Sequence, residues 1–294
     1  MRHRIKGSWD AHAYDQISYP VQYRWGQQVI EWRRWNGNEV VMDAGCGTGL
    51  LTRELAKKVP RGKVYAVDID SNMIQQAMTN LQFFDNVEIV QSSFTDVKLA
   101  RKVDVIFSNS AFHWVQDHGK AFQSFWEILK PSKIHKGDDS NYASQTDSSG
   151  QLLIQCGAYG NLQDIITVLE RIAYSHQFYA YFTDWEQPWH FAKPDETDKL
   201  LEEAGYVNRN VHSTKDHAVF PNRNVYAKFI KTVIMKSYLE QLSLSSNDNN
   251  TNDNEKLKAL FFDMFLNEIK KYSNRLGEQW RLDFIRLNII AHKP

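Results

Sequence analysis

The chain lacks the features that mark secreted, metal-binding and membrane-spanning proteins. Its 294 residues include only two cysteines, Cys46 and Cys156, which form neither a disulfide framework nor a Cys-x-x-Cys metal site. No apolar run approaches the ~18 residues that a spanning helix needs. The basic first residues lead into polar sequence instead of the apolar stretch of a signal peptide. We therefore expect a cytoplasmic protein that has no membrane association and binds no metal.

The chain also lacks net charge, because 35 basic side chains balance 35 acidic ones. A non-specific nucleic-acid binder needs a long-range positive field, so we expect no nucleic-acid partner. Apolar residues make up 42% of the chain, which is ample for one packed domain. Aromatic residues are plentiful, with 9 Trp, 13 Tyr and 16 Phe. We expect a single domain, as a monomer or a homodimer.

Short apolar runs alternate with helical patterns through the first half of the chain. Strands are predicted over residues 40–42, 64–67, 87–90, 103–107 and 152–154, and helices over 50–59, 71–83 and 119–129. This alternation indicates βαβ units, with a mainly parallel sheet and helices on both of its faces. The predicted fold class is α/β, with a doubly wound, Rossmann-like sheet.

The rest of the chain adds helices and two more strands. Helical sequence is predicted over residues 21–35, 161–185, 222–241 and 255–272, and strands over 211–219 and 280–290. The polar tracts 132–149 and 243–254 bury too little apolar surface to order themselves, and we interpret them as surface insertions without function. The sheet core is assigned to residues 36–157, 204–220 and 278–294, and a helical cap to residues 1–35, 158–203 and 221–277.

The most informative stretch is the loop from Val41 to Gly49. A strand ends at Asp43, three glycines follow at alternate positions, and a helix begins near Thr48. Glycine lets a ligand approach bare backbone, and a helix N-terminus offers N–H groups to a carboxylate or phosphate. Dinucleotide-binding enzymes use G-x-G-x-x-G, whose third glycine would fall on Leu50. Asp43 would repel a pyrophosphate and suits an ammonium group, unless it only accepts hydrogen bonds from nearby N–H groups.

A second acid follows the next predicted strand. Asp68 lies 19 residues after Gly49, where a carboxylate can accept hydrogen bonds from both hydroxyls of a ribose. Its alternative role is to cap the following helix. A ribose, an amino group and a small carboxylate together describe S-adenosylmethionine, so the sequence predicts a site for that cofactor.

Three segments resemble the class I methyltransferase family: Asp43–Gly49, Asp68-Ile-Asp70 with Met73, and Ser108–Trp114. The motif Phe112-His-Trp-Val-Gln-Asp117 resembles the branch that holds trans-aconitate and juvenile hormone acid methyltransferases. The resemblance covers residues 9–157 and continues weakly to the final strand. It implies a seven-stranded sheet in the order 3-2-1-4-5-7-6 with strand 7 antiparallel. It also implies S-adenosyl-L-methionine as the cofactor and S-adenosyl-L-homocysteine as the product.

The resemblance implies which residues contact the cofactor. Gly45 and Gly47, with Cys46 between them, cradle the methionine portion, and Asn109 lies near it. Asp68 holds the ribose.

The adenine contacts follow from the same resemblance. Ile69 and Met73 flank the ring, although Met73 could equally be a core residue. Ser93 stands where the family often has an acid for the adenine amino group. Ser93 or the backbone of Phe94 would then make this contact.

For the acceptor, the branch resemblance implies O-methylation of a carboxylate on a small molecule. Gln22 and Trp114 match the positions that meet the substrate carboxylate, and Tyr14 stands where related enzymes close a lid. A carboxylate is ionised near pH 7 and needs no general base. Hydroxyl, nitrogen or carbon acceptors would need a base, for which His113 is the candidate. The proposed catalytic residues are therefore Trp114, His113 and Gln22.

Each of these assignments has an alternative. Trp114 could be a core residue, Gln22 a solvated helix position and His113 a structural residue. The chain could also methylate an N, C or hydroxyl acceptor with His113 as base, or bind S-adenosylmethionine as a regulator without turnover. Aromatic residues of the cap could line a substrate pocket or only pack the cap: Tyr159, Phe178, Tyr181, Trp185 and Trp189.

Overall fold

The computed structural model describes residues 19–131, 150–245, 251–273 and 280–294. The described residues group into two compact units. The sheet unit lies within residues 8–159, 189–214 and 285–294, and the helical unit within residues 160–188 and 215–284. Residues 189–203, which the sequence pattern assigned to the cap, thus group with the sheet. The polar tract 132–149 and Tyr14 lie outside the described residues.

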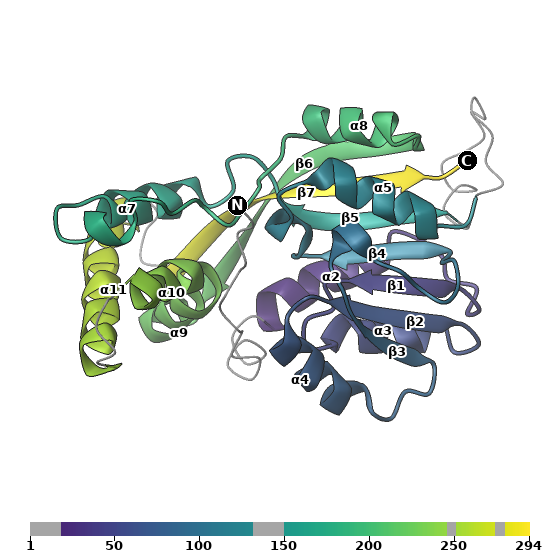
Figure 1. The fold of residues 1–294 in the computed structure, drawn as a ribbon, viewed down its shortest axis with the longest axis horizontal. Coiled ribbons are helices and arrows are strands. Elements are labelled where there is room, and N and C mark those ends of the chain that lie inside the picture. The colour runs from purple at the N-terminus through teal and green to yellow at the C-terminus, as the bar shows by residue number, and fades with distance from the viewer. Residues whose placement is uncertain (1–18, 132–149, 246–250, 274–279) are drawn as a thin grey trace. The chain divides into compact units, whose positions relative to one another are not determined.

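One seven-stranded sheet has the order β3-β2-β1-β4-β5-β7-β6 (Figure 1). Its strands are β1 Val40–Ala44, β2 Lys63–Asp68, β3 Val87–Gln91, β4 Val105–Asn109, β5 Gln151–Gly157, β6 Val207–Phe220 and β7 Trp280–His292. Strands β1 to β5 pair in parallel, and β7 pairs antiparallel with β5. The predicted fold class and strand order are confirmed.

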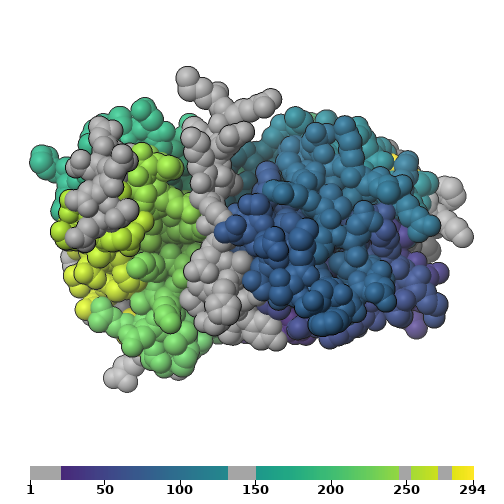
Figure 2. Space-filling model, turned by 60° about the horizontal axis from the view of Figure 1, so that its bottom comes forward, coloured from purple at the N-terminus to yellow at the C-terminus, as the bar shows by residue number. Residues whose placement is uncertain are grey.

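Helices cover both faces of the sheet. The helices of the sheet unit are α2 Arg24–Ile30, α3 Leu50–Lys58, α4 Ser71–Leu81, α5 His118–Ile128 and α8 Pro194–Glu203. Apolar residues of α2 and α3, such as Val29 and Leu55, pack with Val41 on one face. Phe122 of α5 packs with Met42 on the other. Adjacent strand residues are therefore buried on opposite faces, as expected for a parallel sheet covered on both sides. Figure 2 shows the outer surface that the blue residues of the first βα units form.

The helical unit contains most of the remaining helices. These are α7 Gln163–Ala173, α9 Arg223–Phe229, α10 Lys236–Ser245 and α11 Thr251–Ser273, with a π-helical turn at Ile230–Ile234. The turn divides the single helix predicted over 222–241. The polar tract 243–254 is helical at both ends, because α10 runs to Ser245 and α11 begins at Thr251. The tract predicted as a surface insertion thus includes the end of one helix and the start of the next.

Two further elements differ from the predictions. The helix predicted over 21–35 begins with a π-helical turn at Tyr19–Tyr23 and ends at Ile30, where the carbonyl of Ile30 accepts from the Trp35 indole N–H (2.8 Å). Helix α8 was not predicted. Pro194 begins it, and Glu196 accepts from the backbone N–H of Lys193 (3.4 Å), both of which are helix-start signals.

Candidate active site

The glycine loop joins β1 to α3 with three left-handed glycines. Gly45, Gly47 and Gly49 have φ values of 80°, 54° and 86°, which favour glycine. A Cβ at Gly45 would lie 2.2 Å from the Ala111 Cβ, and one at Gly49 would lie 2.6 Å from Leu81 Cδ1. A Cβ at Gly47 would meet nothing within 4 Å. Two of the glycines are therefore required by packing, whereas Gly47 presents bare backbone to open space.

Asp68, at the end of β2, connects the glycine loop to the start of α4. Its Oδ2 accepts from the backbone N–H of Gly47, and its Oδ1 accepts from the backbone N–H of Asp70, both at 2.9 Å. Asp70, not Asp68, caps α4, accepting from the N–H groups of Asn72 and Met73. The alternative role of Asp68 as the helix cap is thus wrong. Burial raises the pKa of Asp68, so a neutral or cationic ligand group is favoured beside it.

Asp43 lies beneath the loop, with 2% of its surface exposed. Its Oδ2 accepts from the Thr52 hydroxyl of α3 (2.6 Å). Burial raises the pKa of Asp43 to about 7; the Thr52 hydrogen bond opposes the rise, and the nearby charge of Asp68 adds to it. This contact joins β1 to α3, so Asp43 positions the loop. Its predicted contact with an ammonium group stays a prediction.

A buried acceptor lies at the end of β4. Asn109 is 8% exposed, and its Nδ2 donates to the carbonyl of Gln22 (3.0 Å). Its Oδ1 is buried and has no hydrogen-bond partner among the described residues. A buried polar atom without a partner costs free energy, so a ligand with a donor is favoured here. The open face of Gly47 and this acceptor fit the methionine portion of S-adenosylmethionine, where the ammonium group would donate.

The residues predicted to contact adenine differ in their exposure to solvent. Ile69 is 64% exposed, whereas Met73 is buried. The Ser93 hydroxyl caps a short 3₁₀ turn, Phe94–Asp96, accepting from the Thr95 N–H. Because the Ser93 hydroxyl already makes this hydrogen bond, the backbone of Phe94 is the favoured contact for the adenine amino group. These contacts stay predictions.

His113 lies in the 3₁₀ turn Phe112–Trp114 that follows β4. Its Nδ1 accepts from the backbone N–H of Gly157 (3.3 Å). Burial, with the charge of Arg286 and the neighbouring His118, lowers the pKa of His113 to about 3. The imidazole is therefore neutral near pH 7, and a neutral ring that accepts at Nδ1 carries its proton on Nε2. Such a ring is a donor and a poor general base.

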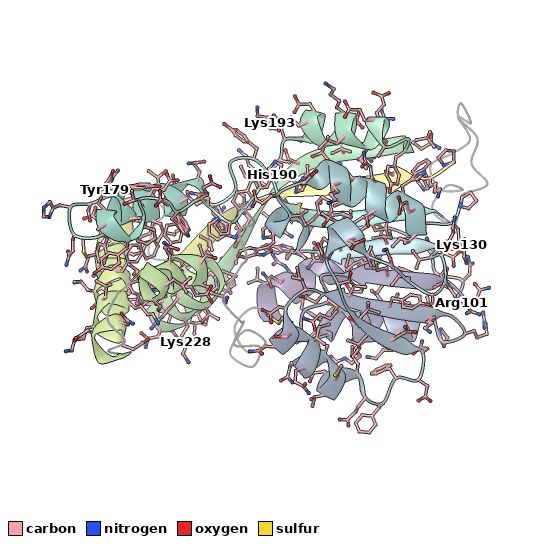
Figure 3. The ribbon with its side chains drawn as sticks, in the orientation of Figure 1. Arg101, Lys130, Tyr179, His190, Lys193 and Lys228 are labelled. Atoms are coloured by element: carbon pink, nitrogen blue, oxygen red, sulfur yellow. The ribbon has the colours of Figure 1, made fainter. Side chains whose placement is uncertain are left out.

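The other predicted acceptor contacts lie in the same unit. Trp114 is half-buried, and its ring packs against those of His113 (5.7 Å) and Trp189 (5.8 Å). Gln22 is half-buried in the π-helical turn before α2 and is joined to the end of β4 through its carbonyl. His190, labelled in Figure 3, donates its backbone N–H to the carbonyl of His113 (2.8 Å).

The aromatic residues proposed for an apolar pocket divide between the units. Phe178 packs against Phe261 (5.0 Å) and Trp185 against Tyr238 (4.3 Å) inside the helical unit. Tyr159 is 64% exposed in the sheet unit, beneath the Lys193 ammonium. Phe178 and Trp185 therefore pack inside the helical unit.

One buried charge was not among the predicted site residues. Arg286 of β7 is 3% exposed, and its guanidinium carbon lies 4.2 Å from the ring centroid of Trp25. Its Nη2 donates to the Ser110 hydroxyl (3.0 Å) and to Gln155 Oε1 (3.3 Å). In the sequence Arg286 is one of several polar residues of β7, together with Asp283 and Asn288. It could have been noticed only by knowing that β7 lies inside the sheet.

Neutral polar residues continue this cluster across the sheet. Asn109 of β4 is in register with Gln155 of β5, which is in register with Asn288 of β7. Gln155 Nε2 donates to Asn288 Oδ1 (2.7 Å). Side-chain hydrogen bonds thus join β5 to β7, and Arg286 connects them to Ser110, which directly follows β4.

His118, beneath this site at the start of α5, makes unfolding pH-dependent. Its ring packs on Phe112 (4.5 Å) and His190 (4.3 Å), and burial lowers its pKa to about 4. In the unfolded chain a histidine has a pKa of ~6.5. As the pH falls, the unfolded chain therefore binds the proton at a higher pH than the folded protein does. Stability from His118 is complete above pH ~6.5 and is lost as the pH falls toward 4.

We expect His118→Phe to show this difference in urea titrations at a series of pH values. The natural protein should lose about 2 kcal/mol more unfolding free energy than the variant does when the pH falls from 7 to 5. Asp43, whose folded pKa lies above its ordinary value, contributes with the opposite sign, but it is present in both proteins and cancels. Parallel pH curves would contradict the burial of a neutral imidazole.

Two absences concern the described residues alone. Within them, no three His, Cys, Asp or Glu side chains gather as metal ligands would. No helix in the described ranges is both long and apolar enough to cross a membrane.

Comparison with known proteins agrees with this fold. Residues 41–132 match the family described as a methyltransferase domain. The chain is a methyltransferase that uses S-adenosylmethionine, and its sheet has the strand order that the resemblance to class I methyltransferases implied.

Relatives extend the likeness beyond that domain. The chain is 23% identical to an uncharacterized methyltransferase of Schizosaccharomyces pombe over 276 residues, which are 91% of each chain. It is 31% identical to a malonyl-[acyl-carrier protein] O-methyltransferase of Halalkalibacterium halodurans, over 42% of this chain and 49% of that one. It is 32% identical to a trans-aconitate 2-methyltransferase of Deinococcus radiodurans, over 32% and 36% of the two chains. These last two matches span half or less of the relatives.

Among solved structures, the fold is similar to that of Haemonchus contortus phosphoethanolamine N-methyltransferase 2 in complex with S-adenosyl-L-methionine. The TM-score is 0.56 at 15% identity, over 97% of this chain and 56% of that one.

Proposed function

We propose that the protein transfers a methyl group from S-adenosylmethionine to a carboxylate oxygen of a small carboxylic acid. The observation that carries this proposal is the hydrogen bond that His113 Nδ1 accepts from the backbone N–H of Gly157 (3.3 Å), which occupies the nitrogen that a base would use. The lowered pKa of His113 agrees with this geometry. A carboxylate acceptor is already ionised near pH 7. It therefore needs no base, whereas hydroxyl, nitrogen and carbon acceptors do.

The two partial relatives support the same class of acceptor. One is named for malonyl-[acyl-carrier protein] and O-methyl transfer, and the other for trans-aconitate. Both names denote acceptors that contain carboxyl groups. The matched segments cover 42% and 32% of this chain and less than half of each relative. The individual acid that each relative methylates is therefore not assigned to this chain.

The chain's own residues bind and orient the reactants in this proposal. Bound S-adenosylmethionine would supply a methyl group that its sulfonium already activates. Gly47, Asp68 and Asn109 would hold the cofactor through backbone, ribose and ammonium contacts. Fixing the geometry of two reactants can lower a barrier by several kcal/mol, up to roughly 7–11 in the best intramolecular cases.

Trp114 and Gln22 are the proposed contacts to the reacting carboxylate. The Trp114 indole N–H and the Gln22 side-chain amide are both donors. The hydrogen bond from Asn109 to the Gln22 carbonyl supports a place for Gln22 beside the end of β4. Trp114 follows β4 by five residues and is half-buried. Neither residue needs to change its protonation state.

The pH dependence of turnover tests this function. We expect methyl transfer to at least one member of a panel of carboxylic acids, with a kcat at saturating cofactor that is flat from about pH 6 to 8, because a carboxylate is ionised throughout this range. Mass spectrometry of the products, with isotope-labelled cofactor, identifies the methyl ester. A rate that rises with pH on an amine or hydroxyl acceptor, with no ester formed, would refute the carboxylate proposal.

A further inference from the structure

We propose that His118 and His190 are positioning residues for methyl transfer, which as a neutral stacked pair hold the turn that carries Trp114. This turn, Phe112–Trp114, follows β4 and precedes α5. The inference goes beyond the proposed function and rests on it in one respect, the place of Trp114 beside the acceptor. The hold on the turn itself does not depend on which acceptor is methylated.

The two histidines donate to backbone carbonyls on either side of Trp114 in the chain. His118, the first residue of α5, donates from Nε2 to the carbonyl of Phe112 (3.2 Å). His190 donates from Nδ1 to the carbonyl of Gln116 (3.0 Å). Because a carbonyl only accepts, these contacts fix the tautomers of the neutral rings, with the proton on Nε2 in one and on Nδ1 in the other.

The segment that contains His190 makes two further contacts with the turn. The His190 backbone N–H donates to the carbonyl of His113 (2.8 Å), and the neighbouring Trp189 packs its ring against that of Trp114 (5.8 Å). The segment and the turn both belong to the sheet unit. The Trp114 ring and the backbone before and after it are therefore held by contacts within one unit.

The imidazole rings of His118 and His190 stack with their centroids 4.3 Å apart and an interplanar angle of 23°. The other ring neighbours of His118 are Phe112 (4.5 Å) and Phe122 (6.3 Å). His118 is 1% exposed, and its Nδ1 is buried with no hydrogen-bond partner among the described residues. A proton on this Nδ1 would be a donor without an acceptor, in a place that excludes water. Two protonated rings at this distance would also repel each other.

The titratable groups near His118 are His190, His113 in the turn and Asp117, which caps α5. Burial lowers the pKa of His118 to about 4, and the charge of His190 adds to this effect. The hydrogen bond to Phe112 and the charge of Asp117 oppose the shift. In an opened turn His118 would regain the ordinary histidine pKa of ~6.5. The closed turn is therefore most stable above pH ~6.5, and acid favours the open one.

Hydrogen exchange of the backbone amides in residues 110–117 tests the hold on the turn. After correction for the intrinsic exchange rate, the opening equilibrium constant of the natural protein should rise about twentyfold from pH 7 to pH 5. His118→Gln keeps a donor near the Nε2 position and cannot take up the proton, so its opening should be nearly independent of pH. Amides of β1 should exchange more slowly than those of the turn at every pH, because the opening is local.

Two further variants isolate the pair. His212→Gln replaces an exposed histidine of β6 and should behave as the natural protein does. His190→Ala removes the hydrogen bond to the Gln116 carbonyl and should open the turn more often even at pH 7.

Nitrogen-15 NMR of the histidines in the natural protein decides if a variant does not fold. His118 should be the Nε2–H tautomer and mainly neutral at pH 5. A His118 that is protonated at pH 5, or that carries its proton on Nδ1, would overturn the assignment. An opening of the turn with the same pH dependence in His118→Gln as in the natural protein would overturn it as well.

Turnover connects the hold on the turn to methyl transfer. With the acids of the panel described above, His118→Phe should lower kcat at pH 7 at least about tenfold, since small misplacements of reacting groups are costly. His118→Gln should restore most of kcat, and the affinity for S-adenosylhomocysteine should stay unchanged in both variants. Ester formation at equal rates in His118→Phe and the natural protein would refute the positioning role and leave the carboxylate proposal standing. Transfer to an amine or hydroxyl acceptor, lost in His118→Phe and restored in His118→Gln, would do the reverse.

Discussion

Replacing Asp68 by alanine is expected to weaken the binding of S-adenosylhomocysteine by about tenfold to a hundredfold. The change removes the proposed acceptor of the ribose hydroxyls and also the anchor of the Gly47 N–H. Hydrogen bonds to charged groups are worth about 1.5–3 kcal/mol each, and each 1.4 kcal/mol changes affinity tenfold. Titration calorimetry on the folded variant measures this loss.

Asp70→Ala is the matched control for this experiment. Asp70 caps α4, so its loss should lower the unfolding free energy by about 1 kcal/mol and leave the affinity nearly unchanged. An Asp68→Ala variant that binds S-adenosylhomocysteine as tightly as the natural protein would show the ribose assignment to be wrong.

The second large effect is expected from a pair of glycine variants. Gly45→Ala places a methyl group against Ala111, at a Cβ–Cβ distance of 2.2 Å in the unrelaxed structure. Overpacking costs roughly 1–3 kcal/mol, and the left-handed backbone adds about 1–2 kcal/mol. We expect Gly45→Ala to lower the melting temperature strongly.

Gly47→Ala should behave differently, because no atom lies within 4 Å of its Cβ. Its unfolding free energy should fall only by the cost of placing alanine in a left-handed backbone conformation, about 1–2 kcal/mol. Its methyl group would stand in the proposed methionine cradle, so affinity for S-adenosylhomocysteine should fall more than about tenfold. Thermal unfolding and calorimetry on both variants separate these effects. Unchanged affinity in Gly47→Ala would mean that the open face is not the cofactor cradle.

The parallel half of the sheet was predictable because each strand carries its own signal. The runs at 40–42 and 64–67 lie within β1 and β2, and each is followed by a helical pattern. The strand order, however, came from the resemblance to methyltransferases and not from periodicity. Helix α8 was missed although Pro194 and Glu196 carry helix-start signals, because the segment was interpreted as part of the cap.

The arrangement of the proposed cofactor residues was predictable because it depends on local backbone. Gly47 and Asp68 are joined directly, as their positions after adjacent strands allow. The hydrogen bonds of Arg286 instead join it to Gln155 and Ser110, which lie more than 100 positions away in the chain. The protonation of His113 likewise depends on burial and on Gly157. No pattern along the chain carries such information.

Strands β6 and β7 each belong partly to both units. β6 passes from the sheet unit to the helical unit after residue 214, and β7 returns after residue 284. The chain therefore crosses from one unit to the other within these two strands. Excising the helical unit would truncate two strands in mid-run and leave ladder groups unpaired, which invites aggregation. Because two of its strands continue into the sheet unit, the helical unit cannot be removed without cutting them.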